Sequence, residues 1–161
     1  MSARIIRKIF SFDGVKPNVL ACSFVEGSDY SKVFGKGSCK FRDETDVFDC
    51  IVGNPPFNDK KEGVQTGSRA KNSLWDIFVI RSLKLLKKNG YLGLIHPPNW
   101  RGLGPDYHKI WDIMKQKQLL YLRIYSKNNG NKYFNVSTRF DVYVLKNKEN
   151  TKATKVIDEL G

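Results

Sequence analysis

The chain has 161 residues, of which 40% are hydrophobic and 27% charged, which suits one globular domain and excludes a low-hydropathy disordered chain. No apolar run reaches the roughly 18 residues of a membrane helix, and residues 1–10 lack the apolar centre of a secretory signal. Three cysteines without a Cys-x-x-Cys pair disfavour a disulfide scaffold and a zinc knuckle, and they fit a cytoplasmic protein. The net charge of +12 favours polyanionic partners, nucleic acid first.

Short apolar or alternating segments predict the strands of the chain. They are expected at residues 18–24, 47–53, 91–96, 119–125 and 140–145. Two helices lie between them in this prediction. The first begins at Ser73, with Asp76 as its capping partner, and stops at Asn89-Gly90. The second spans residues 107–114, where apolar side chains recur at helical spacing.

Residues 126–138, rich in Asn and Lys, are expected to form a loop, and the polar tail that starts at Asn147 is expected to fray at its end. Strands and helices therefore alternate along the chain. That order predicts an α/β fold with a largely parallel sheet, in which ligands bind beyond the carboxyl ends of the strands.

The strand expected at residues 47–53 runs directly into Asn54, Pro55, Pro56 and Phe57. Two prolines fix two successive φ angles and remove two backbone donors. The Asn54 side-chain oxygen and the Pro55 carbonyl are then placed to accept both hydrogens of an exocyclic amine, and Phe57 offers a face for a base. This pattern favours a site that holds a flipped base by its amino group, with a plain rigid turn as the alternative.

The segment FDCIVGNPPF at residues 48–57 resembles motif IV of amino-methyltransferases, most closely that of the adenine-specific (N6) DNA methyltransferases of restriction–modification systems. GYLGLIHPPNW at residues 90–100 and KYFNVSTRFDVYVLKN at residues 132–147 resemble two later stretches of that family, in the same order. The resemblance covers residues 18–147. It implies a Rossmann-like class I methyltransferase sheet, S-adenosylmethionine as cofactor and DNA as partner.

The resemblance also implies roles for individual residues. Asn54, Pro55, Pro56 and Phe57 would be catalytic, and Phe134 would pack with Phe57 against the extruded adenine. For Phe134 an ordinary packing role is the alternative. Core packing is the favoured reading of Trp100.

The resemblance does not extend to the family's cofactor-binding motifs. The family's glycine-rich turn and the acidic residue after its second strand are not found, and its usual Asp-Phe after the third strand is Ser23-Phe24 here. Ser23, Phe24 and Asn54 are therefore the cofactor-binding candidates, and we expect the chain alone to bind S-adenosylmethionine weakly or not at all.

The family's sheet order is 3-2-1-4-5-7-6, and this chain is expected to supply strands 3 to 7, an incomplete sheet. We expect one catalytic-half domain over residues 1–161, with residues 1–17 and 147–161 as less regular extensions. A partner chain, a missing N-terminal region or residues 4–12 would cover the bare strand edge. The chain would then be a fragment, a split subunit or a degenerate relative.

A basic loop after the motif carries four cations that are predicted to contact DNA phosphates, a solvated loop being the alternative. They are Lys60, Lys61, Arg69 and Lys71. No metal site is predicted, and His96 and His108 are expected at the surface or at strand ends. Two other functions stay open: a glutamine-amide or RNA guanine methyltransferase, in which Asn-Pro-Pro-Tyr/Phe also occurs, and a non-catalytic nucleic-acid-binding remnant.

Overall fold

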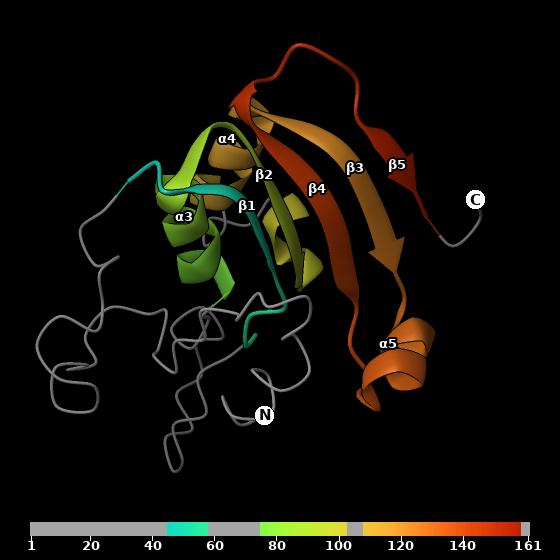
Figure 1. The fold of residues 1–161 in the computed structure, drawn as a ribbon. Coiled ribbons are helices and arrows are strands. Elements are labelled where there is room, and N and C mark those ends of the chain that lie inside the picture. The colour runs from blue at the N-terminus through green and yellow to red at the C-terminus, as the bar shows by residue number, and fades with distance from the viewer. Residues whose placement is uncertain (1–44, 58–74, 103–107, 159–161) are drawn as a thin grey trace, which may run out of the picture. The chain divides into compact units, whose positions relative to one another are not determined.

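The computed structural model describes residues 45–57, 75–102 and 108–158. The elements are, in chain order, β1 (Phe48–Gly53), α3 (Trp75–Leu85), β2 (Leu86–His96), the 3-10 helix η2 (Pro98–Arg101), α4 (His108–Gln116), β3 (Lys117–Tyr125), α5 (Lys127–Phe134), β4 (Phe140–Glu149) and β5 (Lys155–Ile157) (Figure 1). Within these ranges, no helix has the length and apolar character needed to cross a membrane.

The strands form one mixed sheet in the order β1-β2-β4-β3-β5 (Figure 1). β1 runs parallel to β2, and β5 runs parallel to β3. Four strands of the described sheet run in one direction, which confirms the prediction of a largely parallel sheet, and β4 is antiparallel to both of its neighbours. The reason is the connection from β3 to β4, which stays at one end of the sheet through α5 instead of crossing a face.

Several strands end and the chain turns at one end of this sheet, which we call the carboxyl edge. Gly53 at the end of β1 lies opposite Leu94 of β2, and His96 at the end of β2 lies opposite Asp141 of β4. The end of β3 lies opposite the start of β4, where Tyr125 pairs with Phe140. The carboxyl ends of three strands and the amino end of β4 therefore meet at this edge.

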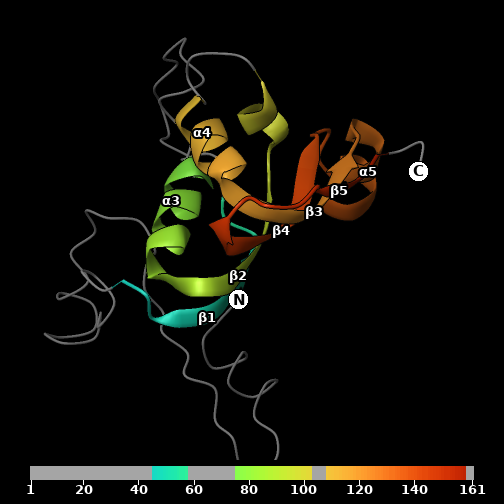
Figure 2. The same cartoon turned by 90° about the horizontal axis from the view of Figure 1, so that it is seen from above.

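Helices α3 and α4 lie on the same face of the sheet (Figure 2), and the core fills the space between them and the strands. Its buried members are Trp75, Val79, Leu86, Leu92, Leu94, Trp100, Ile110, Met114, Leu122, Tyr143 and Leu145. In β4 the buried face carries Asp141, Tyr143 and Leu145, whereas Val144 on the other face is 36% exposed. The face that carries Tyr143 and Leu145 is therefore the one that packs against the helices.

The predicted helix stop at Asn89-Gly90 is wrong, because α3 ends at Leu85 and β2 begins one residue later. Phe48 pairs with the first residue of β2, but Cys50 already pairs with Tyr91. The extra residues of β2 bulge, and Asn89 adopts a positive φ of 67° there. Asn-Gly thus makes an irregularity inside the strand instead of ending the helix.

The loop predicted at residues 126–138 is largely the helix α5. The Ser126 hydroxyl accepts a hydrogen bond from the Asn129 N–H at 3.4 Å, and the Asn129 side chain accepts one from the Ser126 N–H at 3.2 Å. At the other end Asn135 is left-handed, with φ of 55°, and its N–H donates to the Asn131 carbonyl at 3.1 Å. The asparagines that indicated a loop therefore cap a helix at both ends.

The polar tail that starts at Asn147 is bound to the sheet as far as β5, and the predicted fraying of its end concerns residues 159–161, which lie outside the described residues. Asn147 lies within β4, and its side-chain NH₂ donates to the Leu86 carbonyl at 2.9 Å. Beyond β4 the chain returns as β5, held by the fully buried amide of Gln118. That side-chain oxygen accepts from the N–H groups of Thr151 and Lys152, both at 3.0 Å, and its NH₂ donates to the Lys152 carbonyl at 3.0 Å.

His96 ends β2 as predicted, but it lies in the core and not at the surface. Its ring stacks on Trp75 at 4.5 Å between ring centres and meets Tyr143 edge-on at 5.1 Å. Nδ1 donates to the Pro97 carbonyl at 2.9 Å, whereas Nε2 has no hydrogen-bond partner in the described part of the chain. Burial disfavours the charged imidazolium and lowers the pKa of His96 to about 4.

Folding stability should therefore depend on pH through His96. Its pKa falls from an ordinary value of 6.5 to about 4 on folding, so the unfolded chain binds the proton more readily between these values. The contribution is complete above pH 6.5 and is lost as the pH falls towards 4, by up to about 3 kcal/mol. Urea unfolding at pH 7.0 and at pH 4.5 measures the loss.

The variant His96→Gln isolates this effect from the titration of carboxylates. It should show a smaller loss of unfolding free energy between the two pH values than the parent protein does. His108→Gln, at the exposed first residue of α4, should show the parent loss. An unchanged loss in His96→Gln would contradict the assignment.

Candidate active site

The predicted motif lies where expected, at the carboxyl end of β1. Asn54 is exposed, and its side chain has no hydrogen bond to any described residue. Pro55 is buried and anchors the turn, Pro56 is exposed, and Phe57 is half-buried. The strand end therefore presents an amide side chain next to backbone carbonyls, while the two prolines contribute no N–H.

The groups that the carboxyl end of β1 presents are hydrogen-bond acceptors. An amide oxygen and a carbonyl oxygen next to one another suit a group with two N–H bonds, such as an exocyclic amine. Carbonyl oxygens also suit a nearby positive charge. The described residues of β1 and its turn thus fit an amine substrate and a cationic methyl donor. Ser23 and Phe24, which are predicted to bind the cofactor, lie outside the described residues.

The neighbouring strand β2 ends in a second proline pair. Pro97 and Pro98 lead into η2, which closes where the Gly102 N–H donates to the Asn99 carbonyl at 2.9 Å. Trp100 is 2% exposed and belongs to the core, which confirms the packing reading of that residue. Two proline turns therefore stand side by side at the carboxyl edge, after β1 and after β2.

A buried carboxylate ties the second turn to the sheet. Asp141, the second residue of β4, is fully buried. Its Oδ2 accepts from Trp100 Nε1 at 2.9 Å and from Arg101 Nε at 2.8 Å, and its Oδ1 accepts from Arg101 Nη2 at 3.1 Å. Both oxygens are used, so the carboxylate is compensated by a cation and by an indole N–H.

Sequence reasoning missed this pair. The partners lie 40 and 41 residues apart, and no spacing rule joins them. One signal was available, because Asp141 shares the face of β4 that carries Tyr143 and Leu145. A lone carboxylate on an apolar strand face requires a buried donor, and Arg101 beside a second strand end is a suitable one.

Removal of the Asp141 charge should destabilise the fold. Asp141→Asn leaves Arg101 without its counter-charge, and we expect a loss of about 3 kcal/mol, at the low end for a buried pair because the Arg101 side chain is 30% exposed. Asp112→Asn breaks the exposed pair with Lys115 and serves as the matched control, with little effect on stability. Urea unfolding measures the free energy of unfolding of both variants. Equal losses would show that the buried pair stabilises the fold no more than the exposed pair does.

Phe134 also lies at the carboxyl edge. It is the last residue of α5, is 37% exposed, and meets Phe140 edge-on at 4.9 Å between ring centres. Phe140 in turn stacks on Tyr125 at 4.5 Å. The structure thus brings Phe134 to the same edge as Asn54, with β2 between β1, which Asn54 follows, and β4, whose Phe140 contacts Phe134. The four basic residues predicted to contact phosphate, from Lys60 to Lys71, lie outside the described residues.

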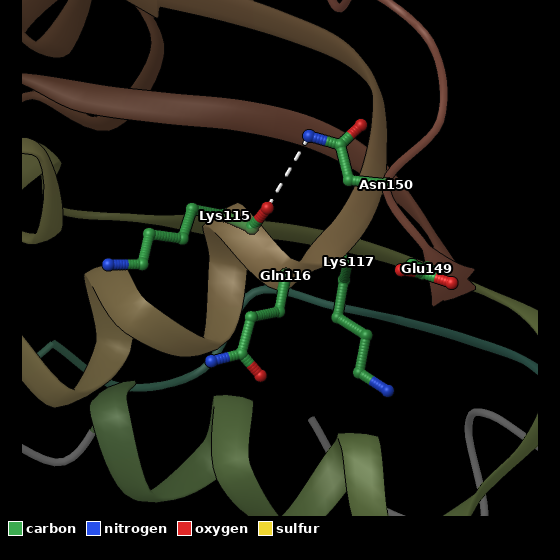
Figure 3. A pocket seen from close by; sticks show the side chains of 5 residues that line it. All are labelled: Lys115, Gln116, Lys117, Glu149 and Asn150. Carbon is green, nitrogen blue, oxygen red and sulfur yellow. Dashed lines mark hydrogen bonds between the residues drawn. The ribbon is translucent and has the colours of Figure 1, made fainter.

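An open pocket of about 450 Å³ lies at the opposite end of the sheet (Figure 3). It is lined by Lys115, Gln116, Lys117, Glu149 and Asn150, and the Asn150 side chain donates to the Lys115 carbonyl at 3.4 Å (Figure 3). These residues surround the start of β3 and the end of β4. The pocket is therefore separate from the carboxyl edge.

Comparison with known proteins bears on this edge. The family of Eco57I restriction-modification methylases matches the chain over residues 20–134. A protein of Methanocaldococcus jannaschii, inferred to be a type II restriction enzyme and methyltransferase, is 34% identical over 84 residues, which are 47% of this chain and 7% of that protein. The chain therefore spans a small part of this relative's length.

Solved structures share the fold at low identity. The methyltransferase subunit of a type I restriction-modification system from Streptococcus thermophilus has a TM-score of 0.52 and 20% identity, over 70% of this chain and 26% of that one. A Listeria monocytogenes protein, inferred to be a class I S-adenosylmethionine-dependent methyltransferase, has a TM-score of 0.50 and 14% identity, over 70% of this chain and 37% of that one.

The sheet is thus of the class I methyltransferase type, as the resemblance implied. The family match covers most of the chain and includes both Asn54 and Phe134. On this evidence the chain belongs to the Eco57I restriction-modification methylase family.

Proposed function

We propose that this chain supplies the base-holding part of a DNA adenine-N6 methyltransferase. The observation that carries the proposal is the exposed Asn54 beside the Pro55-Pro56 turn, at the carboxyl end of a strand in a methyltransferase fold. The net charge of +12 favours a nucleic acid over a protein amide as substrate. DNA is favoured over RNA because the family is that of restriction-modification methylases.

The adenine amine is held by two acceptors in this proposal. The Asn54 side-chain oxygen and the Pro55 carbonyl each accept one amine hydrogen, which draws the nitrogen out of conjugation with the ring and leaves its lone pair outward. S-adenosylmethionine, when bound, supplies the electrophilic methyl group. Because the two prolines hold the turn in place, the acceptors need little reorganisation as positive charge develops on the nitrogen.

No general base of this chain is required. Methylation makes the amine cationic, and a cationic arylamine loses its proton readily to water. Two titratable groups at the described carboxyl edge are also poorly placed to act as a base, because Asp141 is saturated by Arg101 and Trp100 and His96 is buried behind Trp75. The role of Asn54 is therefore hydrogen-bond acceptance and not proton transfer.

Aromatic and basic side chains complete the proposed site. Phe57, directly after the prolines, offers a face to the adenine, and Phe134 offers a second at the same edge. Lys60, Lys61, Arg69 and Lys71 follow the motif in the chain and are proposed to contact the DNA backbone. Phosphate contacts of this kind would make the affinity for DNA fall steeply with salt.

Replacement of Asn54 tests the proposal. In the active assembly, Asn54→Ala should slow methyl transfer to adenine in DNA on the order of 100-fold or more, because a preorganised acceptor is lost. Its thermal stability should not change, since the side chain is exposed and bonds to no described residue. Transfer of a radiolabelled methyl group to DNA, RNA and protein is the measurement.

Asn150→Ala is the matched control, because it removes an exposed asparagine at the other end of the sheet. It should keep the parent rate. A parent rate in Asn54→Ala would overturn the catalytic assignment. Methyl transfer to RNA or protein, with none to DNA, would contradict DNA as the substrate and would identify RNA or protein in its place.

A further inference from the structure

We propose that the end of β3 and the helix α5 form a stacking site for a second, unpaired base of the DNA strand that carries the target adenine. The inference rests on the proposed function and adds a contact outside the adenine site. We name the residues concerned the Tyr133 surface: Arg123, Tyr125, Lys132 and Tyr133.

Tyr133 is the ring of this surface that a base can reach. It is 56% exposed, although it lies within a helix that is capped at both ends. Tyr125 meets it at 82° with 6.0 Å between ring centres, so among the described residues no ring stacks in parallel on Tyr133. Tyr125 itself is occupied, since Phe140 stacks on it at 4.5 Å and the Arg123 guanidinium lies 5.1 Å from its ring centre.

The charge around Tyr133 suits a polyanion. The Lys132 ammonium lies 5.5 Å from the Tyr133 ring centre. Four exposed cations stand on β3, on α5 and on the segment before β4: Arg123, Lys127, Lys132 and Arg139. The sequence from residue 113 to residue 140 holds no Asp or Glu. A flat exposed ring among several exposed cations is the combination that binds a base and its phosphate together.

The position of Tyr133 separates it from the adenine site. Phe134 packs on Phe140 of β4, whereas Tyr133 packs on Tyr125 of β3, one strand further from β1 (Figure 1). Strand spacing places β3 about 14 Å from β1, and β4 about 10 Å from it. At about 3.4 Å per stacked nucleotide, and more when unstacked, a strand reaches this distance in about two to four nucleotides. The base at Tyr133 is therefore a neighbour of the target and not the target.

Binding of single-stranded DNA tests the inference on the full chain. The probe is a fluorescent mixed-sequence oligonucleotide at low salt, because stacking tolerates any base. Tyr133→Leu should weaken binding about tenfold, the loss of one stacked base, and Tyr133→Phe should stay within about twofold of the parent. Because Tyr133 is exposed, thermal unfolding should be unchanged in both variants.

Tyr91→Leu is the matched control. Tyr91 is also an exposed tyrosine, at 42%, with the Lys146 ammonium 5.1 Å from its ring centre, but it lies midway along β2 and away from the carboxyl edge. Its replacement should leave the affinity unchanged. A DNA probe that carries 5-iododeoxyuridine should cross-link to Tyr133 on irradiation, as mapped by mass spectrometry.

The outcomes separate this inference from the proposed function. No affinity of the parent chain for DNA at low salt would overturn both. Tight binding by the parent with equal affinity in Tyr133→Leu, or an equal loss in Tyr91→Leu, would overturn the stacking site alone. A cross-link confined to residues other than Tyr133 would do the same.

Discussion

Asp141 enters the sheet fully buried, and its two oxygens receive three hydrogen bonds from Trp100 and Arg101. A carboxylate in that position requires a cation within reach, because its desolvation is otherwise too costly. The requirement fixes the turn after β2 against the first residues of β4, and the turn after β1 stands beside it. The rigidity of the carboxyl edge thus depends on a charge that need not touch any ligand.

The antiparallel course of β4 gives this edge its composition. In a wholly parallel sheet the edge would hold only strand ends and the loops that follow them. Here it also holds the start of β4 and the helix α5 before it, so aromatic side chains from a late segment stand near the proline turn of an early one. Acceptor groups come from β1 and ring faces come from β3, α5 and β4.

Local sequence signals predicted the elements that depend on local physics. The apolar run before Asn54 and the helical spacing in α4 were sufficient, because burial of one strand or one helix face dictates the pattern. α5 was missed because asparagine is common both in loops and at helix ends. Only the reciprocal hydrogen bonds between Ser126 and Asn129 show that a helix begins here. The Asp141–Arg101 pair was out of reach because it depends on register across the sheet. The roles of Ser23 and Phe24 in cofactor binding remain predictions.

The sheet order also has a consequence for synthesis on the ribosome. β3 bonds to β4 and β5 alone within the described sheet, and both follow it in the chain. While β1 and β2 pair as soon as they emerge, β3 therefore waits as an unpaired segment until β4 has been made. β4 then inserts between two waiting strands at once, led by Phe140 and Asp141 because its amino end emerges first. Nascent chains of this protein should thus gain their carboxyl edge in one late, cooperative step.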